Sequence, residues 1–177
     1  ETSSRNLSSL EGLSMVAVGR LIRIYKKRYQ LKFTIVRLFN LYGPYQSPFY
    51  IVPQVIRQMF VDSKIRIMND KVIRDFLYIK DAASFFIKLM SSDKLINDVV
   101  NLGSGKGISI GELVNLIKKV AGKEDIPVEV EGRYDPASPL VLIANIDRAK
   151  SIGWSPTTSL EYGLKTTIDF YKRLWNL

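Results

Sequence analysis

The stretch Phe33–Pro44, with the sequence FTIVRLFNLYGP, carries the strongest structural signal in this chain of 177 residues. It begins as a largely apolar and β-branched run and ends at Asn40, which is followed by a Tyr-Gly-Pro turn. Short runs of this kind, bounded by Gly and Pro, are typical of strands buried on both faces in the parallel sheets of α/β proteins. Ligands of open α/β sheets bind outside the carboxyl ends of such strands. The sequence therefore predicts a site at Asn40 and Tyr42.

A helix is predicted directly before this strand, over Leu13–Tyr29. Its apolar residues recur with the helical period and define one face, formed by Leu13, Val16, Ala17, Leu21, Ile24 and Tyr25. Basic residues fill the other face and the last turn, where they complement the helix dipole, so a structural role is sufficient for them. A helix joined closely to the strand Phe33–Phe39 is half of a βαβ unit, and the strand that would complete the unit is missing from the sequence.

Short helix and strand signals alternate after Pro44. Helices are predicted over Val52–Val61 (beginning at Pro53), Ala82–Met90, Ser109–Val120, Asp147–Ser151 and Leu160–Trp175, and strands over Ile65–Met68, Ile73–Ile79, Asp98–Leu102 and Val128–Val130. Lys80 and Asp81 are predicted to cap the helix that follows them. Ser109, with Glu112 three residues later, predicts a capping box.

The composition excludes several classes of site. The chain has 46% hydrophobic and 24% charged residues, which suits one globular domain. Because it has no Cys and no His, zinc sites and His-based triads are excluded and no metal is expected. The net charge of +9 is interpreted mainly as a solvated surface, with nucleic-acid binding as a weaker alternative.

The N-terminus and the hydropathy of the sequence bear on where in the cell the protein is found. No apolar run is long enough to cross a bilayer, and the N-terminus lacks the pattern of a signal peptide. We therefore expect a cytoplasmic protein that does not enter the membrane. The first residue is Glu1 rather than Met, so we expect a processed or truncated segment.

A glycine-rich stretch, Gly103–Gly107 with the sequence GSGKG, allows two interpretations. Glycines let backbone N–H groups approach an anion, which suits a phosphate cradle. The stretch lacks the spacing of a P-loop, however, and it also fits a flexible turn between a strand and a helix. We favour the turn.

Four motifs occur in order along the chain: RLFNLYGP at 37–44, RDFLYIKD at 74–81, NLGSG at 101–105 and GWSP at 153–156. Together they resemble the C-terminal half of the nucleotide-sugar epimerases and dehydratases, the extended short-chain dehydrogenase/reductase family. Within that family, the loop Tyr42–Gln46 is similar to the dTDP-glucose 4,6-dehydratases. Asp135–Ala137 with Arg133 is more similar to the UDP-glucose 4-epimerases, so the resemblance leaves the choice between epimerase and dehydratase open.

The resemblance implies an α/β fold in two parts. Residues 1–44 would be the last helix and strand of an NAD-binding Rossmann domain, a partial sheet whose N-terminal strands are missing. Residues 45–177 would be the small α/β region that binds the nucleotide-sugar, linked to UDP or dTDP. By the resemblance, Asn40, Arg74 and Arg133 contact the substrate's phosphates. An Arg fork can bind a phosphate through two hydrogen bonds, and an Asn amide can donate without adding charge.

Two departures from the family weigh against activity. The Gly-x-x-Gly-x-x-Gly fingerprint of the family's NAD site is absent, so this chain alone is not expected to bind NAD. The family's catalytic Tyr-x-x-x-Lys aligns with Glu11–Met15, so that Glu11 replaces the Tyr and Met15 replaces the Lys. A carboxylate has a far lower pKa than a phenol, and Met has neither a charge nor a donor. No catalytic residue is therefore predicted.

Two hypotheses of function follow. In the first, the chain is a truncated or degenerate NAD-dependent epimerase or dehydratase that retains at most the binding of a UDP- or dTDP-sugar. In the second, it is a noncatalytic interaction module that pairs through the helix Leu13–Tyr29, either with a second copy or with a missing N-terminal domain.

Overall fold

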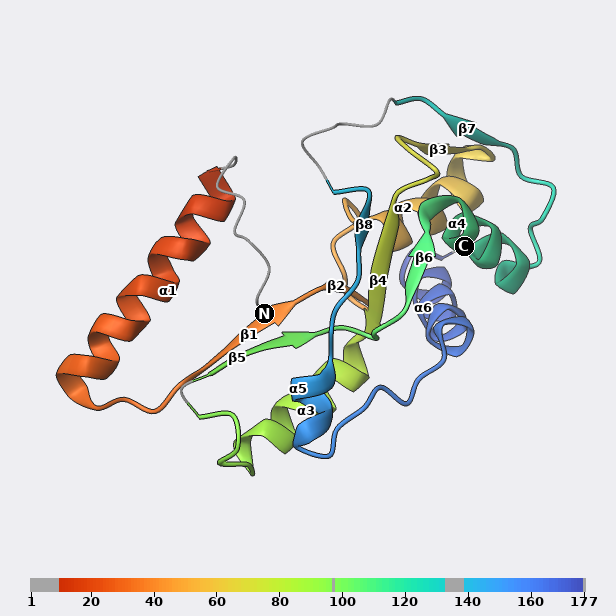
Figure 1. Cartoon of the computed structure of the whole chain (residues 1–177). Coiled ribbons are helices and arrows are strands. Elements are labelled where there is room, and N and C mark those ends of the chain that lie inside the picture. The colour runs from red at the N-terminus through yellow and green to blue at the C-terminus, as the bar shows by residue number, and fades with distance from the viewer. Residues whose placement is uncertain (1–9, 97, 133–138, 177) are drawn as a thin grey trace.

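A computed structural model describes residues 10–96, 98–132 and 139–176 of the chain, which form an α/β fold (Figure 1). The elements follow in the order α1 (Leu10–Tyr29), β1 (Thr34–Leu38), β2 (Asn40–Tyr42), α2 (Ile51–Arg57), a π-helical turn η1 (Gln58–Asp62), β3 (Ile65–Ile67), β4 (Ile73–Tyr78), α3 (Ile79–Met90), β5 (Asp98–Leu102), β6 (Gly107–Ser109), α4 (Ile110–Ala121), β7 (Val128–Val130), β8 (Val141–Leu142), α5 (Asp147–Ser151) and α6 (Leu160–Leu174).

The stretch Phe33–Pro44 forms two strands rather than the predicted single one. β1 pairs in parallel with β5, and the N–H of Phe39 continues that pairing by donating to Leu102 O at 2.9 Å. β2 then pairs in parallel with β4, with Asn40 opposite Phe76. The expected burial on both faces is also wrong, because β5 is the sole partner strand of β1 within the described residues and Leu38 remains 49% exposed. One extended segment thus serves two sheets.

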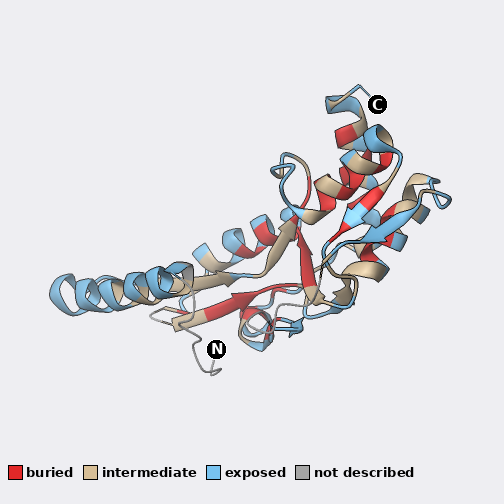
Figure 2. Cartoon of the chain, turned by 90° about the horizontal axis from the view of Figure 1, so that it is seen from above, coloured by how far each residue is buried: buried red, intermediate tan, exposed pale blue. Residues whose placement is uncertain are grey.

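The predicted helix before this strand is confirmed, but its apolar face is not buried. α1 extends away from the rest of the molecule, and most of it is exposed (Figures 1 and 2). Leu13, Leu21 and Ile24 on the predicted face are each at least half exposed. Within the described part of the chain, this face of α1 therefore remains open to solvent.

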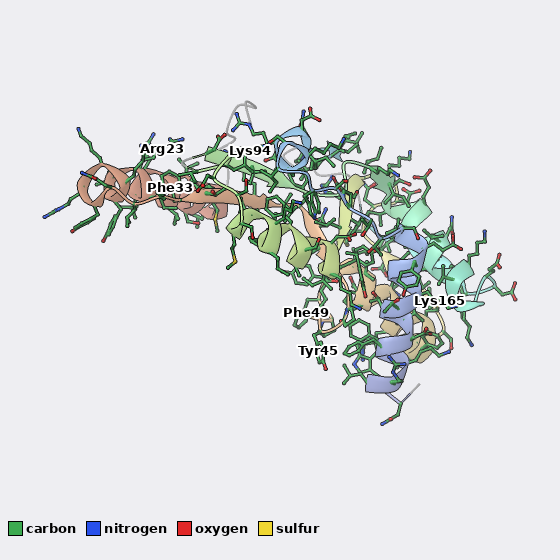
Figure 3. The ribbon with its side chains drawn as sticks, turned by 90° about the horizontal axis from the view of Figure 1, so that it is seen from below. Arg23, Phe33, Tyr45, Phe49, Lys94 and Lys165 are labelled. Atoms are coloured by element: carbon green, nitrogen blue, oxygen red, sulfur yellow. The ribbon has the colours of Figure 1, made fainter. Side chains whose placement is uncertain are left out.

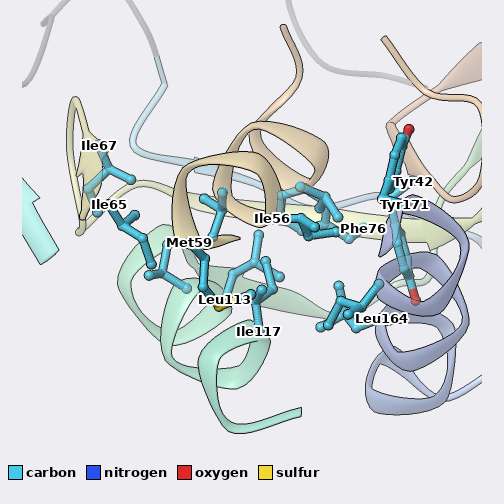
Figure 4. Packing of buried hydrophobic residues seen from close by; sticks show 14 of the residues in the cluster. Tyr42, Ile56, Met59, Ile65, Ile67, Phe76, Leu113, Ile117, Leu164 and Tyr171 are labelled. Atoms are coloured by element: carbon cyan, nitrogen blue, oxygen red, sulfur yellow. The ribbon is translucent and has the colours of Figure 1, made fainter. Parts of the chain in front are cut away.

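β4 separates two clusters of buried side chains, because successive residues of a strand point to opposite faces. Phe76 and Tyr78 belong to the first core, which lies between β2, α2, β3, α4 and α6 (Figure 4). Leu77 belongs to the second core, which lies between β5, α3 and α5. The division of the chain at residue 44 stays a prediction, and the pairing of β1 with β5 joins residues from both sides of it.

Most of the other predicted elements are confirmed within one to three residues. Pro53 lies in the first turn of α2, where its missing N–H has no helical partner to lose. The capping box is present at α4: Ser109 accepts from Glu112 N at 3.1 Å, and Glu112 accepts from Ser109 N at 2.9 Å. The hydrogen bonds from Ser109 hold the pKa of the Glu112 carboxyl below its usual value. The very short strands β6 and β8 are absent from the prediction.

The predicted cap of the helix after β4 is wrong. α3 begins at Ile79 and its N-cap is Tyr78, so Asp81 already lies inside the first turn. The buried Asp81 carboxylate instead accepts hydrogen bonds at 3.0 Å from Thr157 Oγ1 and Thr158 N, which lie just before α6. Asp81 therefore ties α3 to the segment that leads into the last helix.

Candidate functional site

The pairing of β2 with β4 places Asn40 and Arg74 on one face of the same sheet. Asn40 lies opposite Phe76, and Arg74 precedes Phe76 by two residues, so the three side chains share the face of the first core. The Asn40 side chain donates from Nδ2 to Asp75 O at 3.3 Å. Two of the three predicted phosphate contacts thus lie on neighbouring strands.

Arg74 is anchored by backbone carbonyls at the base of this face. Its Nη1 donates to Ile73 O at 2.8 Å, to Pro139 O at 3.0 Å and to Leu140 O at 3.4 Å. These contacts connect β4 to the segment that enters β8. The third predicted contact, Arg133, lies outside the described residues, in the sequence just before this segment.

A hollow of about 430 Å³ opens beside Asn40, and Gln46 contributes to its lining. Gln46 donates from Nε2 to Leu41 O at 2.7 Å, whereas its Oε1 is buried and accepts no hydrogen bond from any described group. Buried polar atoms are nearly always paired, so this solvent-shielded oxygen is an exception among the described groups. The motif analysis missed Gln46 as a site residue, and its place directly after the Tyr-Gly-Pro turn was the one available signal.

A second hollow, of about 380 Å³, continues along α2 toward β3. Ile51, in the first turn of α2, lines both hollows, and we call the two hollows together the groove. Its far part is lined by Arg66, Met68 and Glu131, and the Arg66 Nε lies 3.1 Å from Glu131 Oε1. The near part lies at the start of β2 and the far part at the end of β3.

The turn Gly103–Gly107 binds an anion from within the protein. The fully buried Asp75 carboxylate accepts from Ser104 N at 2.7 Å, Ser104 Oγ at 2.6 Å, Gly105 N at 2.9 Å and Ala144 N at 3.1 Å. A Cβ at Gly103 would lie 2.5 Å from Asp75 Oδ2, which explains the glycine there. The amides of Ser104 and Gly105 are therefore already bound, and the stretch is a turn, but the predicted connection is wrong because the turn leads from β5 into the strand β6 and not directly into a helix.

The glycine-rich turn offers no free amides at Ser104 and Gly105 to the pyrophosphate of NAD, because both already donate to Asp75. α1 carries Glu11 and Met15, the positions that the sequence analysis aligned with a catalytic Tyr and Lys. The Met15 side chain is 66% exposed on α1. Tyr42, close to the site, is not an activated phenol, because burial raises its pKa and its hydroxyl donates to Leu160 O at 3.3 Å.

Two other features are absent from the described residues, a cluster of metal ligands and a helix that could span a membrane. No group of three or more Asp and Glu side chains lies close enough together there to hold a metal ion. Among the described helices, none combines the length and the hydropathy that crossing a membrane requires.

Comparisons with known proteins show what the chain is similar to. The sequence model of the NAD dependent epimerase/dehydratase family matches residues 12–103. The UDP-glucuronate 4-epimerase of Thermodesulfobacterium geofontis is 32% identical over 84% of the chain and 46% of its own length. The dTDP-D-glucose 4,6-dehydratase of Mus musculus is 25% identical over 98% of the chain and 50% of its own length.

A solved structure extends the similarity to the fold. The UDP-glucuronic acid 4-epimerase of Bacillus cereus, in complex with UDP-glucuronic acid and NAD, superposes with a TM-score of 0.85 at 28% identity. The match covers 98% of this chain and 58% of that one. The chain thus spans about half the length of the curated relatives it matches.

Proposed function

Since the chain belongs to the NAD dependent epimerase/dehydratase family, we propose that it supplies the part of such an enzyme that binds the nucleotide-sugar. The ligand is a sugar linked to UDP or dTDP, as in the names of the similar proteins. Asn40 and Arg74 contact its phosphates, together with Arg133. Glu11 and Met15 give no acid/base pair, so the chain by itself binds without catalysing, and NAD is held by residues that it does not contain.

The observation that carries this proposal is the hollow beside Asn40, which Gln46 and Ser47 also line. Sugars present several hydroxyl groups, and polar side chains of this lining can bind them. Asn40 offers an amide at the start of β2, and Arg74 adds positive charge on the same face of the sheet. A ligand that joins a sugar to phosphates can use both kinds of group.

Binding can be measured as a ligand-induced rise in melting temperature. At a concentration of UDP-glucose or dTDP-glucose about 100 times its dissociation constant, binding adds about 2.7 kcal/mol to the free energy of unfolding. We expect a rise of about 5 °C or more, and no rise with NAD. Arg74→Ala should abolish the rise, because it removes the charge that binds the phosphates, and Gln46→Leu should reduce it.

The rise for each variant is compared with its own ligand-free melting temperature, because Arg74 also holds Pro139 and Leu140. Arg173→Ala, which removes an exposed charge near the end of α6, is the matched control and should keep the full rise. If no UDP- or dTDP-sugar raises the melting temperature of the unsubstituted chain, the proposal is wrong.

A second function is favoured by α1, namely association through this helix. Its exposed apolar side chains include Leu13, Leu21, Ile24 and Tyr25. Arg23 lies on the same helix (Figure 3). Exposed apolar surface of this extent marks interaction sites in folded proteins. We propose that a second copy of the chain covers this face, so that the protein is a homodimer.

Sedimentation at several concentrations tests the association. We expect a dimer that dissociates on dilution, and Leu21→Lys should shift it to the monomer because a charge would enter the apolar contact. Charge reversal at Arg20 and Arg23 should weaken the dimer less. Lys165→Glu, on α6, is the control that leaves it unchanged. A monomer at all concentrations would count against the homodimer and favour an N-terminal domain as the cover.

A further inference from the structure

The loop between β2 and α2 forms one side of the groove, and its shape depends on few contacts of its own. Gln46, Ser47 and Tyr50 line the hollow beside Asn40. Within the loop, Tyr50 N donates to Ser47 O at 3.0 Å. Tyr45 has a φ of +64°, in the left-handed region that non-glycine residues seldom adopt. Such a conformation persists where the surrounding structure holds it.

The last helix supplies that support from far away in the sequence. Tyr171, in α6, donates its hydroxyl to Gln46 O across 125 residues. The neighbouring Phe170 contacts the ring of Tyr45, with the ring centroids 4.6 Å apart. α6 therefore contacts both residues at the bend of the loop.

Tyr171 is itself rigidly placed. It is 2% exposed and belongs to the first core (Figure 4). Its ring contacts Phe170 on one side and Trp175 on the other, with centroid separations of 5.2 and 4.4 Å. At the other end of α6, Tyr42 donates to Leu160 O. The helix is thus fixed to β2 at its start and to the loop after β2 near its end.

We propose that Tyr171, assisted by Phe170, is a positioning residue of the nucleotide-sugar site. Its hydroxyl holds the main chain of Gln46, and this keeps Gln46 in the wall of the hollow beside Asn40. Tyr171 does not touch the ligand and acts through Gln46. This inference rests on the proposed function for the identity of the ligand, whereas the hold on the loop is independent of it.

The substitution Tyr171→Phe tests the role, because it removes the hydroxyl and keeps the ring in the first core. Two measurements are made at a temperature well below unfolding. The first is amide hydrogen exchange of Tyr50 without ligand, which we expect to become at least about tenfold faster as the loop opens more often. The second is the dissociation constant for UDP-glucose, which we expect to rise about tenfold.

The matched control is Tyr162→Phe, on the same helix, where the side chain is 64% exposed and lies away from the loop. It should change neither quantity. Phe170→Leu removes the ring contact with Tyr45 and should speed exchange at Tyr50 in the same direction as Tyr171→Phe.

The outcomes separate this inference from the proposed function. Unchanged exchange at Tyr50 in Tyr171→Phe would overturn the hold on the loop. Faster exchange with an unchanged affinity for UDP-glucose would overturn the positioning role, because the bond would then be only structural. If the unsubstituted chain binds no UDP-sugar, the proposed function fails, and the hold of α6 on the loop is decided by the exchange measurement alone.

Discussion

Asp75→Ala is expected to lower the free energy of unfolding by about 4 kcal/mol, the largest effect of any substitution considered for this chain. The carboxylate accepts from the backbone N–H groups of Ser104, Gly105 and Ala144 and from the Ser104 hydroxyl. A buried donor that loses its acceptor costs about 1–3 kcal/mol, and water can replace the acceptor only at the more exposed end of the turn. Since small domains are stable by only about 5–15 kcal/mol, the loss is severe.

The effect is measured by urea denaturation, followed through the fluorescence of Trp154 and Trp175. Asp75→Asn keeps the size and one acceptor oxygen but directs an NH₂ group at N–H donors, so it should cost about half as much. Asp125→Ala, at an exposed position, is the control and should stay within about 0.5 kcal/mol of the unsubstituted chain. If Asp75→Ala unfolds at the same urea concentration as this control, the assignment of Asp75 as the centre of the network is wrong.

Gly163→Ala is expected to destabilise the protein by about 3 kcal/mol, although the same change stabilises most helices. A Cβ at this position in α6 would lie 2.1 Å from Tyr42 Oη and 2.9 Å from Tyr42 Cζ. Tyr42 is buried in the first core and cannot move aside without displacing β2. The added methyl group must therefore push α6 away from the sheet.

The sign of the effect is what distinguishes this position. Gly19→Ala, in α1, meets no atom within 4 Å and should raise stability by about 0.5–1 kcal/mol. Combining Gly163→Ala with Tyr42→Phe removes the nearest contact and should recover part of the loss, which a double-mutant cycle measures. Equal effects of Gly163→Ala and Gly19→Ala on the urea midpoint would contradict the close approach of α6 to β2.

Local patterns in the sequence predicted most of the helices and the longer strands. They could not predict the break at Phe39, because Asn40 resembles a residue at which a strand ends. In the structure Asn40 begins β2, and its side chain donates a hydrogen bond to Asp75 O on β4. The choice of partner strand is made by β4 and β5, which lie 30 residues or more further along the chain. The same limit explains the wrong prediction that Asp81 caps its own helix. Its carboxylate instead accepts hydrogen bonds from Thr157 and Thr158.

The residues of the candidate site, too, were predicted only in part. Asn40 and Arg74 were predicted through motifs that resemble a known family, and the structure brings them onto one face. Gln46 and Asp75 were missed as parts of the site. The importance of Asp75 comes from hydrogen-bond partners that are remote in sequence, and that of Gln46 from an oxygen atom without a partner among the described groups. The hydrogen bond from Ala144 N to the Asp75 carboxylate, for example, spans 69 residues. Such contacts leave no periodic or spacing signal in the chain itself.

The two strands that share one segment also limit how the molecule can move. Only Phe39 separates β1 from β2, and its own N–H is bound to Leu102 O. A hinge needs residues whose dihedral angles can change without breaking pairing, and this junction has none. Rotation of one sheet against the other would break the β1–β5 or the β2–β4 ladder. A displacement at Asn40 is therefore transmitted to the β1–β5 sheet, so the start of β2 and the β1–β5 sheet move together.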